Sequence, residues 1–188
     1  MATTAATPTT TDTGFAMRLL GAAALDPTTY EEVEADRGAT GQACLVVVLS
    51  SLAGGIGARG LGSGSLTSVV FLSGIALISW AAWALVIFQI GSRIMPAPET
   101  HVDMGELLRT IGFAAAPGML QIFGVVPGAA APAFVITWIW MLAAMVVAVR
   151  QALDFASTGR ALAVCVLGWA LALGIAITLG LFFGPTVS

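Results

Sequence analysis

The sequence predicts an all-α integral membrane protein with five transmembrane helices, and three observations support this prediction. Of its 188 residues, 58% are hydrophobic and only 9% are charged, whereas about a quarter of the residues of a soluble domain carry a charge. Five apolar stretches follow one another, each close to the roughly 20 residues that cross the hydrocarbon core of a bilayer. The few charges lie almost entirely on one side of these stretches. Lipid must therefore contact most of the protein, because so few charges cannot cover a surface that faces water.

The chain divides into three parts. Residues 1–14 are rich in Thr and Ala, cannot bury a core and are expected to form a disordered tail. Residues 15–40 are expected to form a cytosolic segment, with an interfacial helix over 15–25 and then an acidic helix that Asp26 caps and Pro27 begins. Residues 41–188 form the membrane domain. Its five predicted spans cover about residues 41–58, 66–90, 107–127, 131–149 and 161–183.

The arginines predict the orientation of the chain. With five spans, the N-terminus and the loops 91–106 and 150–160 share one side, and six of the seven arginines lie on that side. Only Arg59 lies on the other. Because loops rich in basic residues stay in the cytosol, we expect a cytosolic N-terminus and an outer C-terminus. All ten acidic residues also fall on the cytosolic side, so any recognition of a partner should occur there.

Nothing in the sequence indicates catalysis. Zinc-protease, nucleophile-elbow, phosphate-loop and dinucleotide motifs are absent, and no acidic residue lies deep in a span. His101, Asp103 and Glu106 could offer a metal one imidazole and two carboxylates, but Asp103 and Glu106 have the spacing of a helix capping box, which is the preferred interpretation. We therefore expect no enzyme activity, cofactor or metal. A net charge of −3 also argues against a nucleic-acid partner.

The third predicted span has the most distinctive sequence. Small residues and the pair Gly112-Phe113 precede Pro117 in the middle of the span. Proline has no N–H, so it removes one intrahelical hydrogen bond and should kink the helix. Small residues at such positions allow neighbouring helices to approach closely in lipid. We expect Gly112, Phe113 and Pro117 to be structural residues of this kinked helix.

Three segments of the chain resemble a known family. They are Pro-Thr-Thr-Tyr-Glu-Glu at 27–32, Leu-Arg-Thr-Ile-Gly-Phe-Ala-Ala-Ala-Pro at 108–117 and Ser-Thr-Gly-Arg at 157–160. In this order, and over residues 19–183, they resemble prokaryotic members of the Yip (Ypt-interacting protein) family. The resemblance implies a five-helix domain with a cytosolic N-terminus in a prokaryotic plasma membrane. Eukaryotic relatives bind Rab-type GTPases and carry an Asp-Leu-Tyr-Gly-Pro motif that is absent here, so GTPase binding is not expected.

These observations predict a non-enzymatic membrane scaffold or partner-docking protein. Its partners would be membrane lipids and another membrane or cytosolic protein, or a second copy of the chain. Three alternatives remain: an accessory subunit of a larger membrane complex, a small transporter, channel or lipid-handling protein, and cytosolic charges that only satisfy one another and fix the topology. The residues expected to form the docking face are Tyr30, Glu31, Glu32, Asp36, Arg109 and Arg150. Their carboxylates would meet a basic partner or the chain's own arginines, and their guanidinium groups lipid headgroups.

Overall fold

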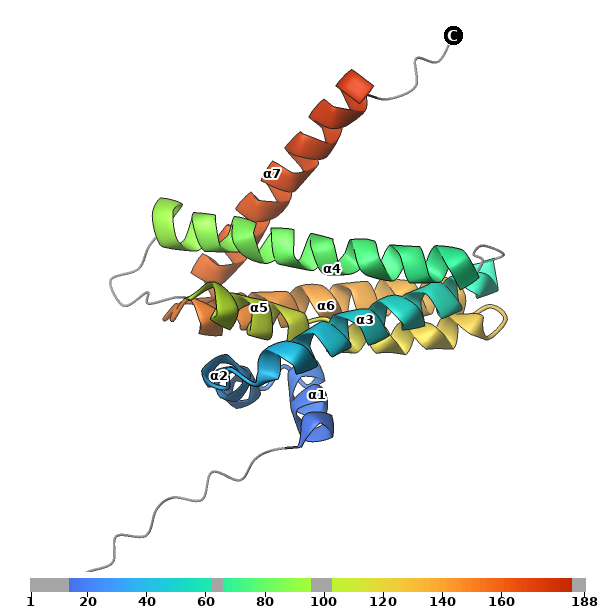
Figure 1. Ribbon diagram of the computed structural model, residues 1–188, viewed down its shortest axis with the longest axis horizontal. Helices are drawn as coiled ribbons and strands as arrows, with labels where there is room; N and C mark the ends of the chain where they lie inside the picture. Colours follow the sequence, from blue (N-terminus) through green and yellow to red (C-terminus); the bar gives the residue numbers. More distant parts are fainter. Residues whose placement is uncertain (1–13, 62–65, 96–102, 184–188) are drawn as a thin grey trace, which may run out of the picture.

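The computed structural model describes residues 14–61, 66–95 and 103–183, and every regular element within these ranges is helical (Figure 1). The predicted tail up to residue 13 and His101, which was considered as a metal ligand and not preferred, lie outside the described residues. The elements are α1 (Phe15–Ala23), α2 (Pro27–Ala35), α3 (Ala39–Gly57), η1 (Ala58–Leu61), α4 (Leu66–Gln89), η2 (Ile90–Ile94), α5 (Met104–Phe113), η3 (Ala116–Val125), α6 (Ala130–Ala152) and α7 (Thr158–Phe183).

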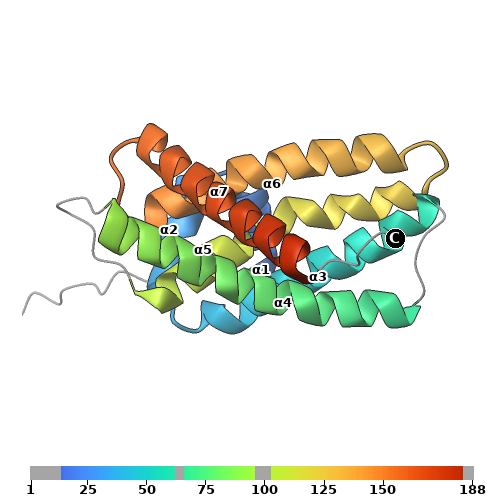
Figure 2. The ribbon, with the colours of Figure 1, turned by 90° about the horizontal axis from the view of Figure 1, so that it is seen from above.

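Four stretches of helix are long and apolar enough to cross a membrane: Ala39–Gly57, Gly74–Ile94, Met104–Val125 and Ala130–Ala152. They correspond to the first four predicted spans and lie side by side as a bundle in both views (Figures 1 and 2). The predicted fifth span is α7, of which Thr158–Gly174 forms a shorter apolar stretch. A count of five spans therefore stays a prediction, and so does the orientation of the termini.

One end of the bundle collects the charges, and we call it the charged end. It is the end at which α4 finishes and α5 begins, and its arginines are Arg93, Arg109, Arg150 and Arg160. Helices α1 and α2 lie crosswise against one side of the bundle, with α2 nearer the charged end (Figure 1). On another side, α7 starts at the charged end and then leaves the bundle at an angle (Figures 1 and 2). Its residues Val164 and Cys165 are buried, whereas Leu171 and Leu173 are exposed.

The third span changes helix type where the sequence predicts a kink. Helix α5 ends at Phe113, and the 3-10 helix η3 begins at Ala116, with Pro117 in its first turn. A tighter 3-10 turn suits this place, because the missing N–H of Pro117 already interrupts the α-helical pattern. Gly112 and Phe113 are buried as expected. A methyl group on Gly112 would lie only 2.7 Å from the Cβ atom of Ala43, so this glycine allows α5 and α3 to touch.

Helices α1 and α6 end in the same motif, without the glycine that usually stands there. Leu25 follows α1 with a φ angle of 62°, and Asp154 follows α6 with a φ angle of 50°. The backbone N–H of the next residue then donates to a carbonyl five positions back, at 3.0 Å after α1 and 2.9 Å after α6. This is the bonding of a Schellman motif. Left-handed backbone costs most residues with a side chain about 1–2 kcal/mol, and Asp and Asn adopt it more readily, so Leu25 is the more unusual of the two.

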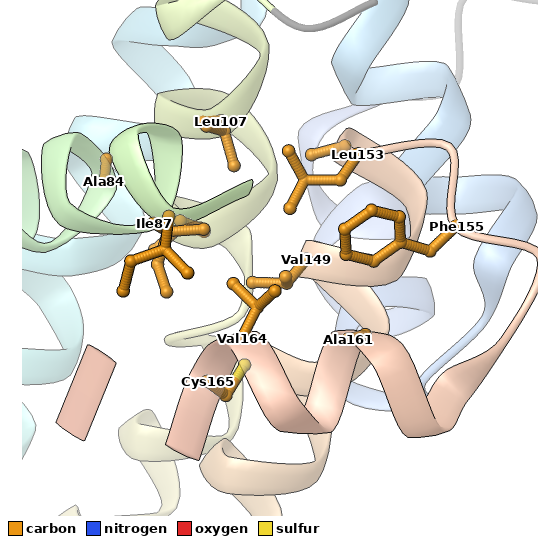
Figure 3. Close-up of a cluster of buried hydrophobic side chains, with 12 residues drawn as sticks. Ala84, Ile87, Leu107, Val149, Leu153, Phe155, Ala161, Val164 and Cys165 are labelled. Atoms are coloured by element: carbon orange, nitrogen blue, oxygen red, sulfur yellow. The ribbon is translucent and has the colours of Figure 1, made fainter. Parts of the chain in front are cut away.

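An apolar cluster just inside the charged end joins four helices (Figure 3). Ile87 of α4, Leu107 of α5, Val149 of α6 and Val164 of α7 are all fully buried in it. Phe155, in the loop between α6 and α7, closes the cluster with only 3% of its surface exposed. This packing fixes the loop after α6 against the start of α5, and so it positions the charged groups described below.

Candidate functional site

Arg109 fastens α2 to the bundle. Its guanidinium is buried, and its Nε atom donates to the carbonyl oxygens of Val33 and Glu34, both at 3.0 Å. Its Nη2 atom also donates to the Glu34 carbonyl. These carbonyls belong to the last turn of α2, where backbone acceptors lack intrahelical donors and a positive charge is favourable. Arg109 of α5 thus caps the C-terminus of another helix.

Arg18 binds two of the carboxylates that were predicted to dock a partner. It is only 4% exposed and lies 2.9 Å from Oε1 of Glu32 and 2.7 Å from Oδ2 of Asp36. A third bond of 3.3 Å reaches Gln42 at the start of α3. The hydrogen bond from Arg18 lowers the pKa of Asp36 below its ordinary value. For Glu32 and Asp36, the arrangement matches the alternative in which charges of the chain satisfy one another.

Tyr30 is buried and holds α1 in place. Its hydroxyl donates to the carbonyl of Ala22 at 3.0 Å, and burial raises the pKa of this phenol. The indole Nε1 of Trp140, in α6, donates to the carbonyl of the adjacent Ala23 at 2.7 Å. Both acceptors are in the last turn of α1. Tyr30 is therefore buried beneath the expected docking face and does not form part of its surface.

An open pocket of about 650 Å³ lies at the charged end, between α2, the start of α5 and the loop after α6. Four carboxylates and one arginine are among the residues that line it: Glu31, Glu34, Glu106, Asp154 and Arg150. We call it the acidic pocket.

Several side chains of the acidic pocket are held by neighbours. The Glu31 carboxylate accepts a hydrogen bond of 2.7 Å from Nε2 of Gln151. Glu106 accepts from the backbone N–H of Asp103 at 2.7 Å, which confirms the predicted capping box. Arg150 turns toward its own loop, where its Nε atom donates to the carbonyl of Phe155 at 3.3 Å.

Among the carboxyl groups of the acidic pocket, that of Glu34 has the most strongly shifted pKa. Burial, and after it the negative charges of Asp154, Glu106 and Glu31, raise its pKa to about 7 against the opposing effect of Arg109. A carboxyl group with such a pKa is only partly ionised near neutrality. A cation that entered the pocket would favour its ionised form and would be attracted by the other carboxylates.

A second cavity, of about 740 Å³, lies within the apolar length of the bundle between α4, α6 and α7. It is lined mostly by apolar side chains, by the hydroxyl of Ser79 and by four indoles, those of Trp80, Trp83, Trp138 and Trp169. Trp83 and Trp169 contact each other with ring centroids 6.4 Å apart. Among the described residues, the buried indole N–H groups of Trp80 and Trp83 have no acceptor. Helix α7 closes only part of this cavity because it leaves the bundle.

The structure places two of the six predicted docking residues, Glu31 and Arg150, at the acidic pocket. Glu32 and Asp36 bind Arg18, and Tyr30 and Arg109 are buried. Sequence reasoning missed Glu34, Glu106 and Asp154 as pocket residues. The spacing of Glu31 and Glu34 carried a usable signal, because residues three apart share one face of a helix. No comparable signal joined them to Asp154, more than a hundred residues away.

The fold and the charged end define a class: a helical membrane protein whose polar groups gather at one end of an apolar bundle. A family model described as the Yip1 domain matches residues 23–179 of the chain. The chain therefore belongs to the Yip family, a family of membrane proteins, as the sequence motifs predicted. Neither a curated protein nor a solved structure matches it.

Proposed function

We propose that this Yip-family protein is a non-enzymatic scaffold of a prokaryotic plasma membrane, which docks a protein partner with basic side chains at its acidic pocket. Part of the proposal is a topology of five spans with a cytosolic N-terminus and an outer C-terminus, which places the pocket in the cytosol. The observation that carries the proposal is the meeting of four carboxylates from α2, α5 and the loop after α6 around one open pocket.

One of these carboxylates, that of Glu34, stands where it destabilises the isolated protein. Glu34 is half-buried beside other negative charges, which is why its pKa is raised to about 7. Perturbed acids concentrate at functional sites, because a stable fold alone gives no reason for them. A basic partner would relieve the repulsion at Glu34 and provide that reason.

The proposal is tested by recovering partners of the tagged full-length chain in nanodiscs and identifying them by mass spectrometry. The informative variant is Glu34→Gln with Asp154→Asn, which removes two charges and keeps the side-chain size. Asparagine also tolerates left-handed backbone. The matched control is Arg59→Gln, which removes one exposed charge in η1 at the other end of the bundle.

We expect one protein to be recovered in a fixed ratio with the wild type and the control. Its recovery should fall about tenfold or more with the double variant, because close charge pairs across an interface contribute about 1.5 kcal/mol or more. Equal recovery with all three chains would contradict docking at the acidic pocket. If only a second copy of the chain is recovered, the chain associates with itself, and docking of a different protein is contradicted.

A second candidate function, the handling of an apolar molecule, is favoured by the cavity with the four indoles. Two buried indole N–H groups without an acceptor would suit a ligand that brings an oxygen into an apolar site. The variant Ala76→Phe places a phenyl ring in the cavity, and Ile78→Phe on the lipid-facing side of the same helix is its control. Native mass spectrometry should find an apolar molecule on the wild type and the control, and not on Ala76→Phe. A wild type without any such molecule would exclude this function.

A further inference from the structure

Helix α1 presents an apolar stripe that the rest of the described chain leaves uncovered. Met17, Leu20 and Ala24 follow one another at spacings of three and four, so they lie on one helix face. Met17 is 60% exposed and Leu20 is 63% exposed. On the opposite face, Phe15 packs with its ring 6.4 Å from that of the buried Phe113. The outer stripe is therefore a feature of a helix that is firmly packed on its inner side.

The depth of α1 follows from its contacts with α6. Gln151, near the charged end of α6, binds Glu31 of α2. Trp140, eleven residues earlier in the same helix, binds the carbonyl of Ala23 at the end of α1. At 1.5 Å per residue, these two contacts lie about 16 Å apart along α6. Figure 1 agrees, because α1 lies further from the charged end than α2 and runs across the direction of the spans.

A segment at this depth needs partners for its polar groups within the protein, and the end of α1 and its charged side chain have them. The carbonyls of its last turn accept hydrogen bonds from Tyr30 and Trp140. Its one charged side chain, Arg18, binds Glu32 and Asp36 of the α2 segment. The guanidinium thus extends from α1 toward α2 and the charged end, as a basic side chain does when its helix lies in lipid and its charge reaches the interface.

We propose that α1 is inserted in the plane of the membrane, into the leaflet at the charged end, with its Met17–Leu20–Ala24 stripe among the acyl chains. The partner of this surface is lipid, and the stripe continues the lipid-facing sides of the spans. An amphipathic helix that lies in the membrane plane buries its apolar face about 5–10 Å into the boundary between headgroups and acyl chains. Because α1 occupies only one leaflet, it adds area to that leaflet alone. This inference is independent of docking at the acidic pocket.

Spin labels at single cysteines test this proposal on the full-length protein in nanodiscs. Cys44 and Cys165 are first replaced by alanine, and a nitroxide is then attached to Met17→Cys or Leu20→Cys. The water-facing reference is Arg37→Cys, an exposed residue between α2 and α3. The lipid-facing reference is Ile139→Cys, near the middle of α6 and 63% exposed. The measurement is the collision of each nitroxide with oxygen, which enters lipid, and with a water-soluble nickel chelate.

We expect the labels at Met17 and Leu20 to meet oxygen and to avoid nickel, with an oxygen-to-nickel ratio several-fold above that at Arg37. Their ratio should approach that at Ile139. A ratio equal to that at Arg37 would place α1 in water and overturn the proposal. Protection from both reagents would also overturn it, because the stripe would then be covered by protein.

Discussion

Replacing Arg109 by methionine should release α2 from the bundle. Methionine keeps most of the length of the side chain and removes the guanidinium, which donates to the carbonyls of Val33 and Glu34. A hydrogen bond from a charged group contributes about 1.5–3 kcal/mol, and a buried acceptor left without a donor costs about 1–3 kcal/mol. Water can reach both carbonyls once α2 moves and replaces part of the lost hydrogen bonding. We therefore expect the free energy that docks α2 on the bundle to fall by about 3 kcal/mol.

Hydrogen exchange of the amides of α2 measures this loss directly. If α2 exchanges through undocking, a loss of about 3 kcal/mol corresponds to roughly 100-fold faster exchange in Arg109→Met. In Arg109→Lys, α2 should exchange at a rate between those of the wild type and Arg109→Met, because an ammonium group cannot span two carbonyls as a planar guanidinium does. Arg93→Gln, an exposed arginine at the same end, serves as the control and should exchange like the wild type. Unchanged protection of α2 in Arg109→Met would refute the capping role.

Three further predictions concern helix packing, pH and the fixing of α1. Gly112→Ala should destabilise the protein by about 1–3 kcal/mol through its clash with Ala43, whereas Gly74→Ala, with open space around it, should leave the melting temperature in nanodiscs equal or slightly higher. Glu34 has a folded-state pKa of about 7 against an ordinary value of 4.5, so its contribution to stability is complete below pH 4.5 and is lost as pH rises through 7. Glu34→Gln should therefore raise the stability at pH 8 by about 1–2 kcal/mol, a value reduced for solvent screening, and a melting temperature that depends on pH as in the wild type would contradict this. Tyr30→Phe should cost about 1 kcal/mol by removing one buried hydrogen bond to α1. The melting temperature in nanodiscs should fall accordingly, and a wild-type melting temperature would be the contrary result.

The course of the chain through its apolar helices could be predicted from sequence because hydrophobicity and helix signals act locally. The Asp26-Pro27 start of α2 and the capping box of Asp103 and Glu106 both formed as their spacing predicts. Pro117 marked the place where the third span changes, since a missing N–H acts on its own helix. The form of that change, a 3-10 helix, was not predicted.

The candidate site was predicted less well because its residues meet through tertiary packing. Arg109 and Glu106 look alike as charges at the start of a span, yet one is buried under α2 and the other lines the acidic pocket. Arg18 carried no sign in the sequence that it would bind Glu32 and Asp36. The motif that ends α1 and α6 could not be predicted either, because Leu25 and Asp154 occupy positions where glycine is the usual sequence signal.

The contacts of α1 and α2 with α6 impose an order on biogenesis. The bond between Glu31 and Gln151 joins residues 120 apart, and the bond between Ala23 and Trp140 joins residues 117 apart. A ribosome that adds about 5–20 residues per second needs roughly 6–20 s to proceed from the end of α2 to Gln151. During this interval, the carboxylates of α2 and the apolar stripe of α1 await a docking surface that has not yet been synthesised. Helices α1 and α2 are thus made well before the helix that completes their packing, which leaves them open to chaperones and proteases in the meantime.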